Sequence, residues 1–166
     1  MTGRTIIIDG YNLMQRVKGF GRALDDSLES ARRALIGTVG RYLARKRLFD
    51  KTVIVFDGAR NMGEFKNFKV GAVSVVFSAF RESADDRIIS LIKKAAPPVR
   101  VAVVSDDNYV TNNARAHGAD IISCADFMAL AGGGKDRVCH EADDKKLDDD
   151  TMASINDSLK KAWRIK

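Results

Sequence analysis

Short, unbroken apolar runs separated by segments of helical periodicity constrain the fold of this chain more than any other feature. The clearest runs cover residues 5–8, 52–56 and 99–104. Runs without polar alternation are typical of strands that are buried on both faces, as in parallel sheets covered by helices. Because such strands alternate with helices along the chain, the sequence predicts an α/β fold with a mainly parallel sheet.

The same pattern predicts five strands in all and the helices that connect them. The other two strands are expected at residues 70–77 and 119–122. Residues 59–69 contain a glycine and several charges and are interpreted as a loop. The expected result is a three-layer domain with a five-stranded sheet. Helices are predicted at residues 27–50, with Ser27 as the N-terminal cap, and at residues 84–95, 107–117 and 125–130.

The length of the chain, 166 residues, suits one domain with one hydrophobic core. We assign residues 1–131 to that domain. Residues 132–150 are rich in glycine and charge and are interpreted as a flexible linker. Residues 151–166 predict a C-terminal amphipathic helix that carries Trp163.

The sequence shows no feature of a membrane or secreted protein. No apolar run reaches the roughly 20 residues that cross a membrane, and no signal peptide precedes the first predicted strand. Cys124 and Cys139 do not form a C-x-x-C pair, so a zinc site is not expected and reduced thiols are the simplest interpretation. We therefore expect a cytoplasmic protein.

The net charge of +6 favours a polyanionic partner. Two groups of basic residues are candidates for contacts with phosphates, one in the predicted helix at residues 27–50 and one in the predicted loop at residues 59–69. A solvated helix face explains the first group equally well. The groups are Arg41, Arg45 and Lys46, and Arg60, Lys66 and Lys69, respectively.

Aspartates lie where the predicted strands end. Asp9, Asp57 and Asp106 each follow a strand, and Asp85 opens the helix after the third strand. Because the carboxyl ends of parallel strands meet at one edge of a sheet, these four carboxylates are expected to lie together. Clustered carboxylates raise each other's pKa unless a cation neutralises them, and their oxygens suit Mg²⁺ or Mn²⁺. The pattern predicts a metal site that supports displacement at phosphorus.

Polar residues beside these aspartates are candidates for a supporting role. Gly10 predicts a tight turn that returns Asn12 to the acidic edge, where its amide can hold a carboxylate, a water or a phosphate. Asp86, Ser105 and Asp107 adjoin the acids directly. Each of these four supporting residues has an ordinary alternative as a turn residue or a helix cap.

Four segments resemble the motifs of one known family. Residues 7–13, IIDGYNL, resemble the opening signature of NYN domains of the YacP-like branch, which is part of the PIN-like nuclease group. The later motifs of that branch follow in the same order, with serine and valine each replacing a threonine. They are VFDG at residues 55–58, SADDRI at residues 83–88 and VVSD at residues 103–106.

The resemblance implies a parallel sheet under an acidic, metal-binding pocket that cleaves RNA. By matching position it implies that Asp9, Asp85 and Asp106 are catalytic acids and that Asp57 joins them in binding Mg²⁺ or Mn²⁺. The expected function is a metal-dependent endoribonuclease whose partner is RNA, with ribosome-bound RNA as one form of substrate. One departure is the acidic, glycine-rich segment at residues 132–150, which is unusual for a surface that meets RNA.

Three other classes of α/β domain are disfavoured by the residues after the first strand. A receiver domain needs an acidic pair there, a haloacid-dehalogenase-like phosphatase needs Asp-x-Asp, and a dinucleotide-binding domain needs a glycine-rich turn. Here Tyr11 occupies the place of a second aspartate, and Gly10 stands alone. The remaining alternative is a module that binds RNA or the ribosome and retains the acids without efficient catalysis.

Overall fold

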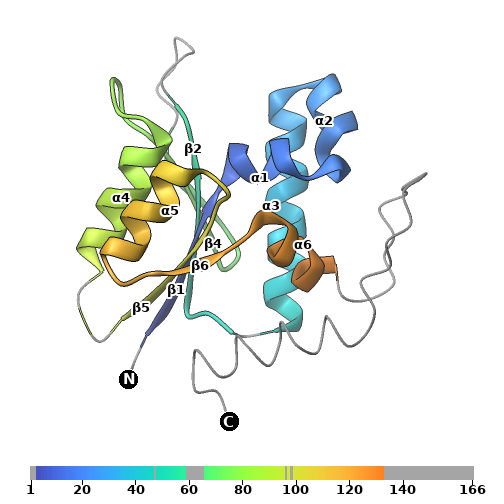
Figure 1. The fold of residues 1–166 in the computed structure, drawn as a ribbon. Helices are drawn as coiled ribbons and strands as arrows, with labels where there is room; N and C mark the ends of the chain where they lie inside the picture. Colours follow the sequence, from blue (N-terminus) through green and yellow to red (C-terminus); the bar gives the residue numbers. More distant parts are fainter. Residues whose placement is uncertain (1–2, 47, 59–65, 96, 98, 133–166) are drawn as a thin grey trace.

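The computed structural model describes residues 3–46, 48–58, 66–95, 97 and 99–132, and Figure 1 labels its elements. A six-stranded sheet forms the centre, in the order β3-β4-β2-β1-β5-β6. Neighbouring strands are parallel except β3 and β4, which are antiparallel. The strands are β1 (Arg4–Asp9), β2 (Lys51–Phe56), β3 (Phe68–Val70), β4 (Val73–Phe77), β5 (Arg100–Val104) and β6 (Asp120–Ile122).

Helices cover both faces of the sheet and complete three layers (Figure 1). One face is covered by α4 (Ala84–Lys94) and α5 (Asn108–Ala116). The opposite face is covered by α1 (Gly10–Arg16), the short 3-10 helix η1 (Lys18–Phe20), α2 (Gly21–Asp26), α3 (Leu28–Arg45) and α6 (Cys124–Gly132). The α/β class expected from the sequence is confirmed.

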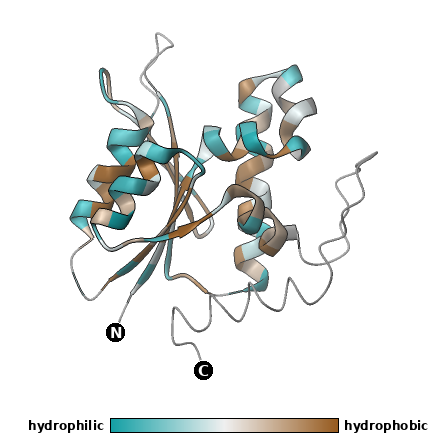
Figure 2. Cartoon of the chain, in the orientation of Figure 1, coloured by the Kyte–Doolittle hydropathy of each residue, from teal (hydrophilic) through white to brown (hydrophobic). Residues whose placement is uncertain are grey.

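Strand β1 shows why its apolar run is unbroken. Ile6 and Ile8 belong to the core beneath α1, α3 and α6, whereas Ile7 belongs to the core beneath α4 and α5. None of the three side chains is more than 1% exposed. Figure 2 shows the apolar colour on the strands and on the helix sides that face them. Burial on both faces, driven by the hydrophobic effect, therefore holds the three layers together.

The prediction of one strand at residues 70–77 and of five strands in total was wrong. The chain instead forms a hairpin in which β3 pairs with β4 and places Val70 opposite Val73. Gly71 makes the turn with a φ of +58°, a left-handed conformation that favours glycine. All three residues of β3 are exposed, so this strand has no buried apolar run by which the sequence could reveal it.

The segment after β1 is a helix, where the sequence analysis expected a tight turn. Gly10 is the first residue of α1, and it is needed for close packing. A Cβ atom at Gly10 would lie 2.3 Å from a ring carbon of Phe56, at the end of β2. The glycine therefore allows α1 to pack directly on the neighbouring strand end.

The long helix predicted from Ser27 is confirmed as α3. Ser27 Oγ accepts a hydrogen bond from the backbone N–H of Ser30 at 3.0 Å, the geometry of an N-cap. The helix ends at Arg45, before the predicted end at Asp50. The Asp50 carboxylate instead accepts a hydrogen bond from the backbone N–H of Arg4 at 2.7 Å. The C-terminal end of α3 thus leads to the edge where β1 and β2 begin.

Two predictions fall on residues that the structure does not describe. These are the linker, apart from Gly132, which ends α6, and the C-terminal helix at residues 151–166. None of the helices that the structure does describe is long and apolar enough to cross a membrane.

Candidate active site at the carboxyl ends of the strands

Asp9 lies at the centre of the predicted acidic edge, as the last residue of β1 and the N-cap of α1. Its Oδ1 accepts a hydrogen bond from the backbone N–H of Asn12 at 3.3 Å, and its Oδ2 accepts one from Ser105 Oγ at 3.2 Å. The side chain is 5% exposed. Burial raises the pKa of Asp9 to about 6, helped by the negative charges of Asp85 and Asp107, although the two hydrogen bonds oppose the shift.

Asp85 lies in the first turn of α4, a helix whose N-cap is Ser83. Its pKa is raised by partial burial first, and then by the carboxylates of Asp107, Asp86 and Asp57. Among the residues that the structure describes, the charges that shift the pKa of Asp85 and Asp9 are therefore negative. The fold brings carboxylates from four segments of the chain into mutual repulsion at one edge of the sheet.

Asp57 follows β2 and is held by a serine that the sequence analysis did not select. Ser78 Oγ donates a hydrogen bond to Asp57 Oδ1 at 3.2 Å and accepts one from the backbone N–H of Gly58 at 3.1 Å. Ser78 is 6% exposed and follows β4, so its position after a strand is the signal that could have identified it. A Cβ at residue 58 would lie 2.7 Å from the Ser78 carbonyl oxygen, which explains Gly58.

Asn12 links the edge to α6 through the oxygen of its side-chain amide. Its Oδ1 accepts hydrogen bonds from the backbone N–H of Asp106 at 2.9 Å and from Cys124 Sγ at 3.3 Å. Burial, together with Asp106, raises the pKa of the Cys124 thiol to about 12. Cys124 therefore remains a protonated donor in the core and does not serve as a nucleophile at neutral pH.

The adjacent residues Asp106 and Asp107 have different surroundings. Asp106 Oδ1 accepts a hydrogen bond from the backbone N–H of Cys124 at 3.1 Å, so this carboxylate is directed to the start of α6. Asp107 is the N-cap of α5, and its charge contributes to the pKa of both Asp9 and Asp85. Asp107 thus combines its role as a helix cap with an electrostatic effect on the two raised acids.

The other two predicted supporting residues also occupy the edge. Ser105 is buried, donates to Asp9 and accepts a hydrogen bond from the backbone N–H of Asp107 at 3.1 Å. Asp86 is exposed in the first turn of α4, where its Oδ2 accepts a hydrogen bond from Ser83 Oγ at 2.8 Å. Neither residue is itself the helix cap, since the caps are Asp107 for α5 and Ser83 for α4, but each contacts the cap beside the acids.

The donor chemistry of this edge fits a hard divalent cation. Mg²⁺ commonly uses one or two carboxylates, several waters and the phosphates of its substrate. Asp9 and Asp85 offer carboxylate oxygens, and the charges that shift their pKa values are those of other carboxylates. Among the residues that the structure describes, however, no three Asp, Glu, His or Cys side chains are grouped as ligands of one ion. The residues therefore fit a site with few protein ligands better than a closed protein cage.

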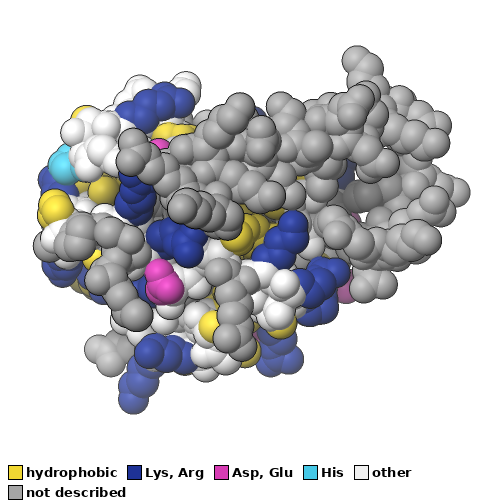
Figure 3. Space-filling model, turned by 90° about the horizontal axis from the view of Figure 1, so that it is seen from below, with side chains coloured by type: hydrophobic (Ala, Val, Ile, Leu, Met, Phe, Trp, Pro, Cys, Tyr) yellow, Lys and Arg dark blue, Asp and Glu magenta, His cyan; other side chains and the backbone are white. Residues whose placement is uncertain are grey.

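The two predicted basic groups lie in different places. Arg41, Arg45 and Lys46 are at the C-terminal end of α3, which reaches the edge opposite the acids (Figure 1). Figure 3 views the protein from that side and shows, among the residues drawn in colour, several Lys and Arg side chains and few acidic ones. Lys66 and Lys69 are exposed beside and within β3, and Arg60 lies outside the described residues. Of the described residues in the two groups, Lys66 and Lys69 are the ones beside or within β3.

The fold and the acidic edge define a class of protein: an α/β domain with a parallel sheet that presents carboxylates at its strand ends. The chain belongs to the family of YacP-like NYN domains, whose model matches residues 6–164. None of the curated proteins matches the chain.

Two solved structures share the fold. Both are crystal structures of Rae1 (YacP) from Bacillus subtilis, one of them a mutant with a single substitution. The mutant is 22% identical with a TM-score of 0.65, over 80% of this chain and 76% of the other. The second structure is 20% identical with a TM-score of 0.64, over 96% of this chain and 79% of the other.

Proposed function

We propose that this protein is a metal-dependent endoribonuclease whose active site is the acidic edge formed by Asp9, Asp57, Asp85 and Asp107, with Asp106 beside it. Membership of the NYN family, which is nuclease-like, supports a nuclease activity. The observation that carries the proposal is the placement of these carboxylates at one edge of the sheet, where burial first, and the negative charges of neighbouring carboxylates second, raise the pKa of Asp9 and Asp85. Perturbed carboxylates at strand ends are a recurrent property of active sites.

Hydrolysis of a phosphodiester forms one bond from a water oxygen to phosphorus and breaks one bond from phosphorus to a ribose oxygen. Without a cation the pKa of Asp9 is about 6, so this buried carboxylate is one whose charge a bound cation would neutralise. Ser105 fixes Asp9 Oδ2 by its hydrogen bond, and Asn12 fixes Oδ1. A bound Mg²⁺ or Mn²⁺ would neutralise the negative charge of the carboxylates and lower the pKa of a water molecule.

Asp85 and Asp107 suit the binding of that cation together with Asp9. Asp85 is half-buried at the start of α4, and the helix begins close to the edge. The N-terminus of a helix also favours an anionic substrate, because its free N–H groups and dipole are positive. We place the activity in the cytoplasm, the compartment expected from the sequence.

The test is cleavage of a labelled structured RNA and of a single-stranded DNA in Mg²⁺, Mn²⁺ or EDTA. Asp9→Asn and Asp85→Asn should each abolish metal-dependent cuts within the RNA. Asp26→Asn, at an exposed position in α2, is the matched control and should cleave normally. Equal cleavage by wild-type protein and the three variants would refute the assignment of the site.

A catalytically weak RNA-binding or ribosome-binding module is the second candidate. It is favoured by one observation, that no three potential ligands are grouped among the described residues. Such a module would bind RNA with similar affinity in wild-type and Asp85→Asn protein and would show no cleavage in any metal. The same experiment, with binding measured in parallel, therefore separates the two functions.

A further inference from the structure

A pocket beside the acidic edge combines aromatic and cationic side chains that the proposed chemistry does not use. It has a volume of about 330 Å³ and lies between the first turns of α3 and the strand ends of β2, β3 and β4. The size is at the lower end of the range for small-molecule sites, roughly 300–1,000 Å³, and is sufficient for one nucleotide. Its cationic and aromatic lining includes Arg32, Arg33, Lys66, Phe68 and Phe77.

The aromatic side chains form a continuous series from the acidic edge to the open side of the pocket. The ring centroids of Tyr11 and Phe56 are 5.2 Å apart, those of Phe56 and Phe77 are 5.8 Å apart, and those of Phe77 and Phe68 are 6.3 Å apart. Tyr11 Oη donates a hydrogen bond to the Asp57 carbonyl oxygen at 3.4 Å. Phe68, at the far end, is 44% exposed and presents its ring to the pocket.

Arg32 fixes the inner part of this series. Its guanidinium carbon lies 5.4 Å from the ring centroid of Tyr11, 5.7 Å from that of Phe56 and 5.5 Å from that of Phe77. Its Nε also donates to Tyr11 Oη at 2.9 Å. Cation–π contacts of this kind pre-organise a guanidinium, so the positive charge is held at the inner wall of the pocket.

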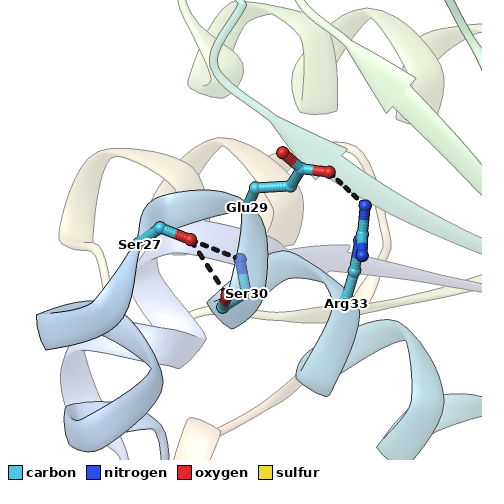
Figure 4. A network of polar contacts seen from close by, with 4 residues as sticks. All are labelled: Ser27, Glu29, Ser30 and Arg33. Carbon is cyan, nitrogen blue, oxygen red and sulfur yellow. Dashed lines mark hydrogen bonds and ion pairs between the residues drawn. The ribbon is translucent and has the colours of Figure 1, made fainter.

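The outer rim carries two further cations. Lys66 is exposed, and Arg33 forms an ion pair with Glu29 one turn earlier in α3 (Figure 4). The side chains of Arg33 and Glu29 are 78% and 68% exposed, so the pair is weak and Arg33 can turn to an incoming phosphate at little cost. Among the described residues that line the pocket, three are therefore positively charged and one is negatively charged.

We propose that this pocket binds one nucleotide of single-stranded RNA, next to the phosphodiester held at the acidic edge. The base stacks on Phe68, and the phosphate lies between Arg33 and Lys66. Arg32 completes the inner wall. The charge balance selects a polyanion, and the open aromatic ring selects a base over a simple anion. This inference rests on the proposed function only for the identity of the substrate as RNA.

The test measures binding of a fluorescent single-stranded RNA by anisotropy, in EDTA so that cleavage cannot contribute. Phe68→Ala and Phe68→Leu should both raise Kd, by roughly 5- to 100-fold for alanine, because leucine and alanine lack a stacking face. Val70→Ala, at an exposed residue of the same strand outside the pocket lining, is the matched control and should leave Kd unchanged.

The cationic rim is tested by the salt dependence of the same binding. Arg33→Gln should reduce the slope of log K against log salt by about 0.7, the value for one phosphate contact on a single strand. Arg115→Gln, at an exposed residue of α5 on the other face of the sheet, should not change the slope. Equal slopes for the two variants would contradict the assignment of Arg33.

The outcomes separate the pocket from the nuclease. Phe68-dependent binding without metal-dependent cleavage would support the pocket and contradict an endoribonuclease that acts on free RNA. Cleavage by wild-type protein with unchanged Kd in both Phe68 variants would refute the pocket alone. Absence of measurable RNA binding in EDTA would also overturn the pocket.

Discussion

Ser105 Oγ donates a hydrogen bond to Asp9 Oδ2 at 3.2 Å and so joins the carboxyl ends of β5 and β1. Both residues are buried, with exposures of 1% for Ser105 and 5% for Asp9. The same hydroxyl accepts a hydrogen bond from the backbone N–H of Asp107 at 3.1 Å. One serine thus positions two of the carboxylates that repel each other at the candidate active site.

Ser105→Ala should therefore affect both stability and titration. Loss of the hydroxyl leaves the buried oxygen of Asp9 with one fewer donor, which is expected to cost about 1–2 kcal/mol of unfolding free energy. The pKa of Asp9 should rise further, because the Ser105 hydrogen bond lowers it. Urea unfolding and carboxyl titration by NMR would measure the two effects. An unchanged pKa would contradict the role of Ser105.

Asp9→Asn should make the protein more stable at neutral pH although it removes the activity. The folded state raises the pKa of Asp9 from 3.8 to about 6. Its favourable contribution is therefore complete below about pH 4 and is lost as the pH rises through about 6. Asparagine does not ionise and still serves as an N-cap, so it avoids the burial of a charge.

The gain in unfolding free energy for Asp9→Asn is expected to be about 1–2 kcal/mol at pH 8 and to disappear near pH 4. Urea unfolding at pH 4, 6 and 8 would measure it. Asp26→Asn, at an exposed residue, is the control and should give a constant difference across this range. A gain that does not vary with pH would show that the ionisation of Asp9 is not its cause.

Gly10→Ala should destabilise the fold by roughly 1–3 kcal/mol, the usual range for an overpacked core. The new Cβ would lie 2.3 Å from Phe56 Cε1, and the Phe56 ring is fully buried. Gly40→Ala is the matched control, because a Cβ there meets nothing within 4 Å and replaces a glycine inside α3. That variant should gain about 0.5–1 kcal/mol. Thermal unfolding should show a lower Tm for Gly10→Ala and a higher Tm for Gly40→Ala, and a similar change in both variants would contradict the role of the contact with Phe56.

Arg81→Gly should stabilise the loop between β4 and α4 by about 0.5–1 kcal/mol. Arg81 has a φ of +66°, a left-handed conformation that is unfavourable for a side chain other than glycine. Arg81→Ala removes the same guanidinium but keeps the strain, so its unfolding temperature should not rise. A similar rise in the unfolding temperature of both variants would show that loss of the guanidinium charge, and not relief of the backbone conformation, is the cause.

The sequence was most informative where burial and periodicity coincide. Unbroken apolar runs predicted β1, β2 and β5, because strands buried on both faces need no polar alternation. The exposed strand β3 carried no such signal. Helix α1 was missed because Gly10 has the properties of a turn residue, whereas its actual role depends on contact with Phe56, which lies far along the chain on β2.

The candidate site was predictable in its position and less so in its members. Strand ends placed Asp9 and Asp57 at one edge, as the structure has them. The contacts of Asp106 and Asp107 were not predictable, because Asp106 accepts a hydrogen bond from the start of α6 and Asp107 accepts one from α5, and the contact with α6 exists only in the fold. Likewise, the pocket around Arg32 and Phe68 joins residues from α3 and β3 that no local motif connects.

Divalent cations should stabilise the wild-type protein more than any variant of the acidic edge. Burial and the charges of neighbouring carboxylates raise the pKa of Asp9 and Asp85. A bound cation would reduce the repulsion between these carboxylates. Binding to the folded state alone adds RT ln(1 + [L]/Kd), about 2.7 kcal/mol at a cation concentration of one hundred times Kd.

Thermal unfolding in increasing Mg²⁺ or Mn²⁺ should therefore show a concentration-dependent rise in Tm for wild-type protein. The rise should be lost in Asp85→Asn and retained in Asp26→Asn, which lies outside the edge. It should also weaken below pH 6, as protons compete with the cation for Asp9. An equal rise in Tm for wild-type protein and Asp85→Asn would show that the cation binds elsewhere, and it would contradict the assignment of a metal site to the acidic edge.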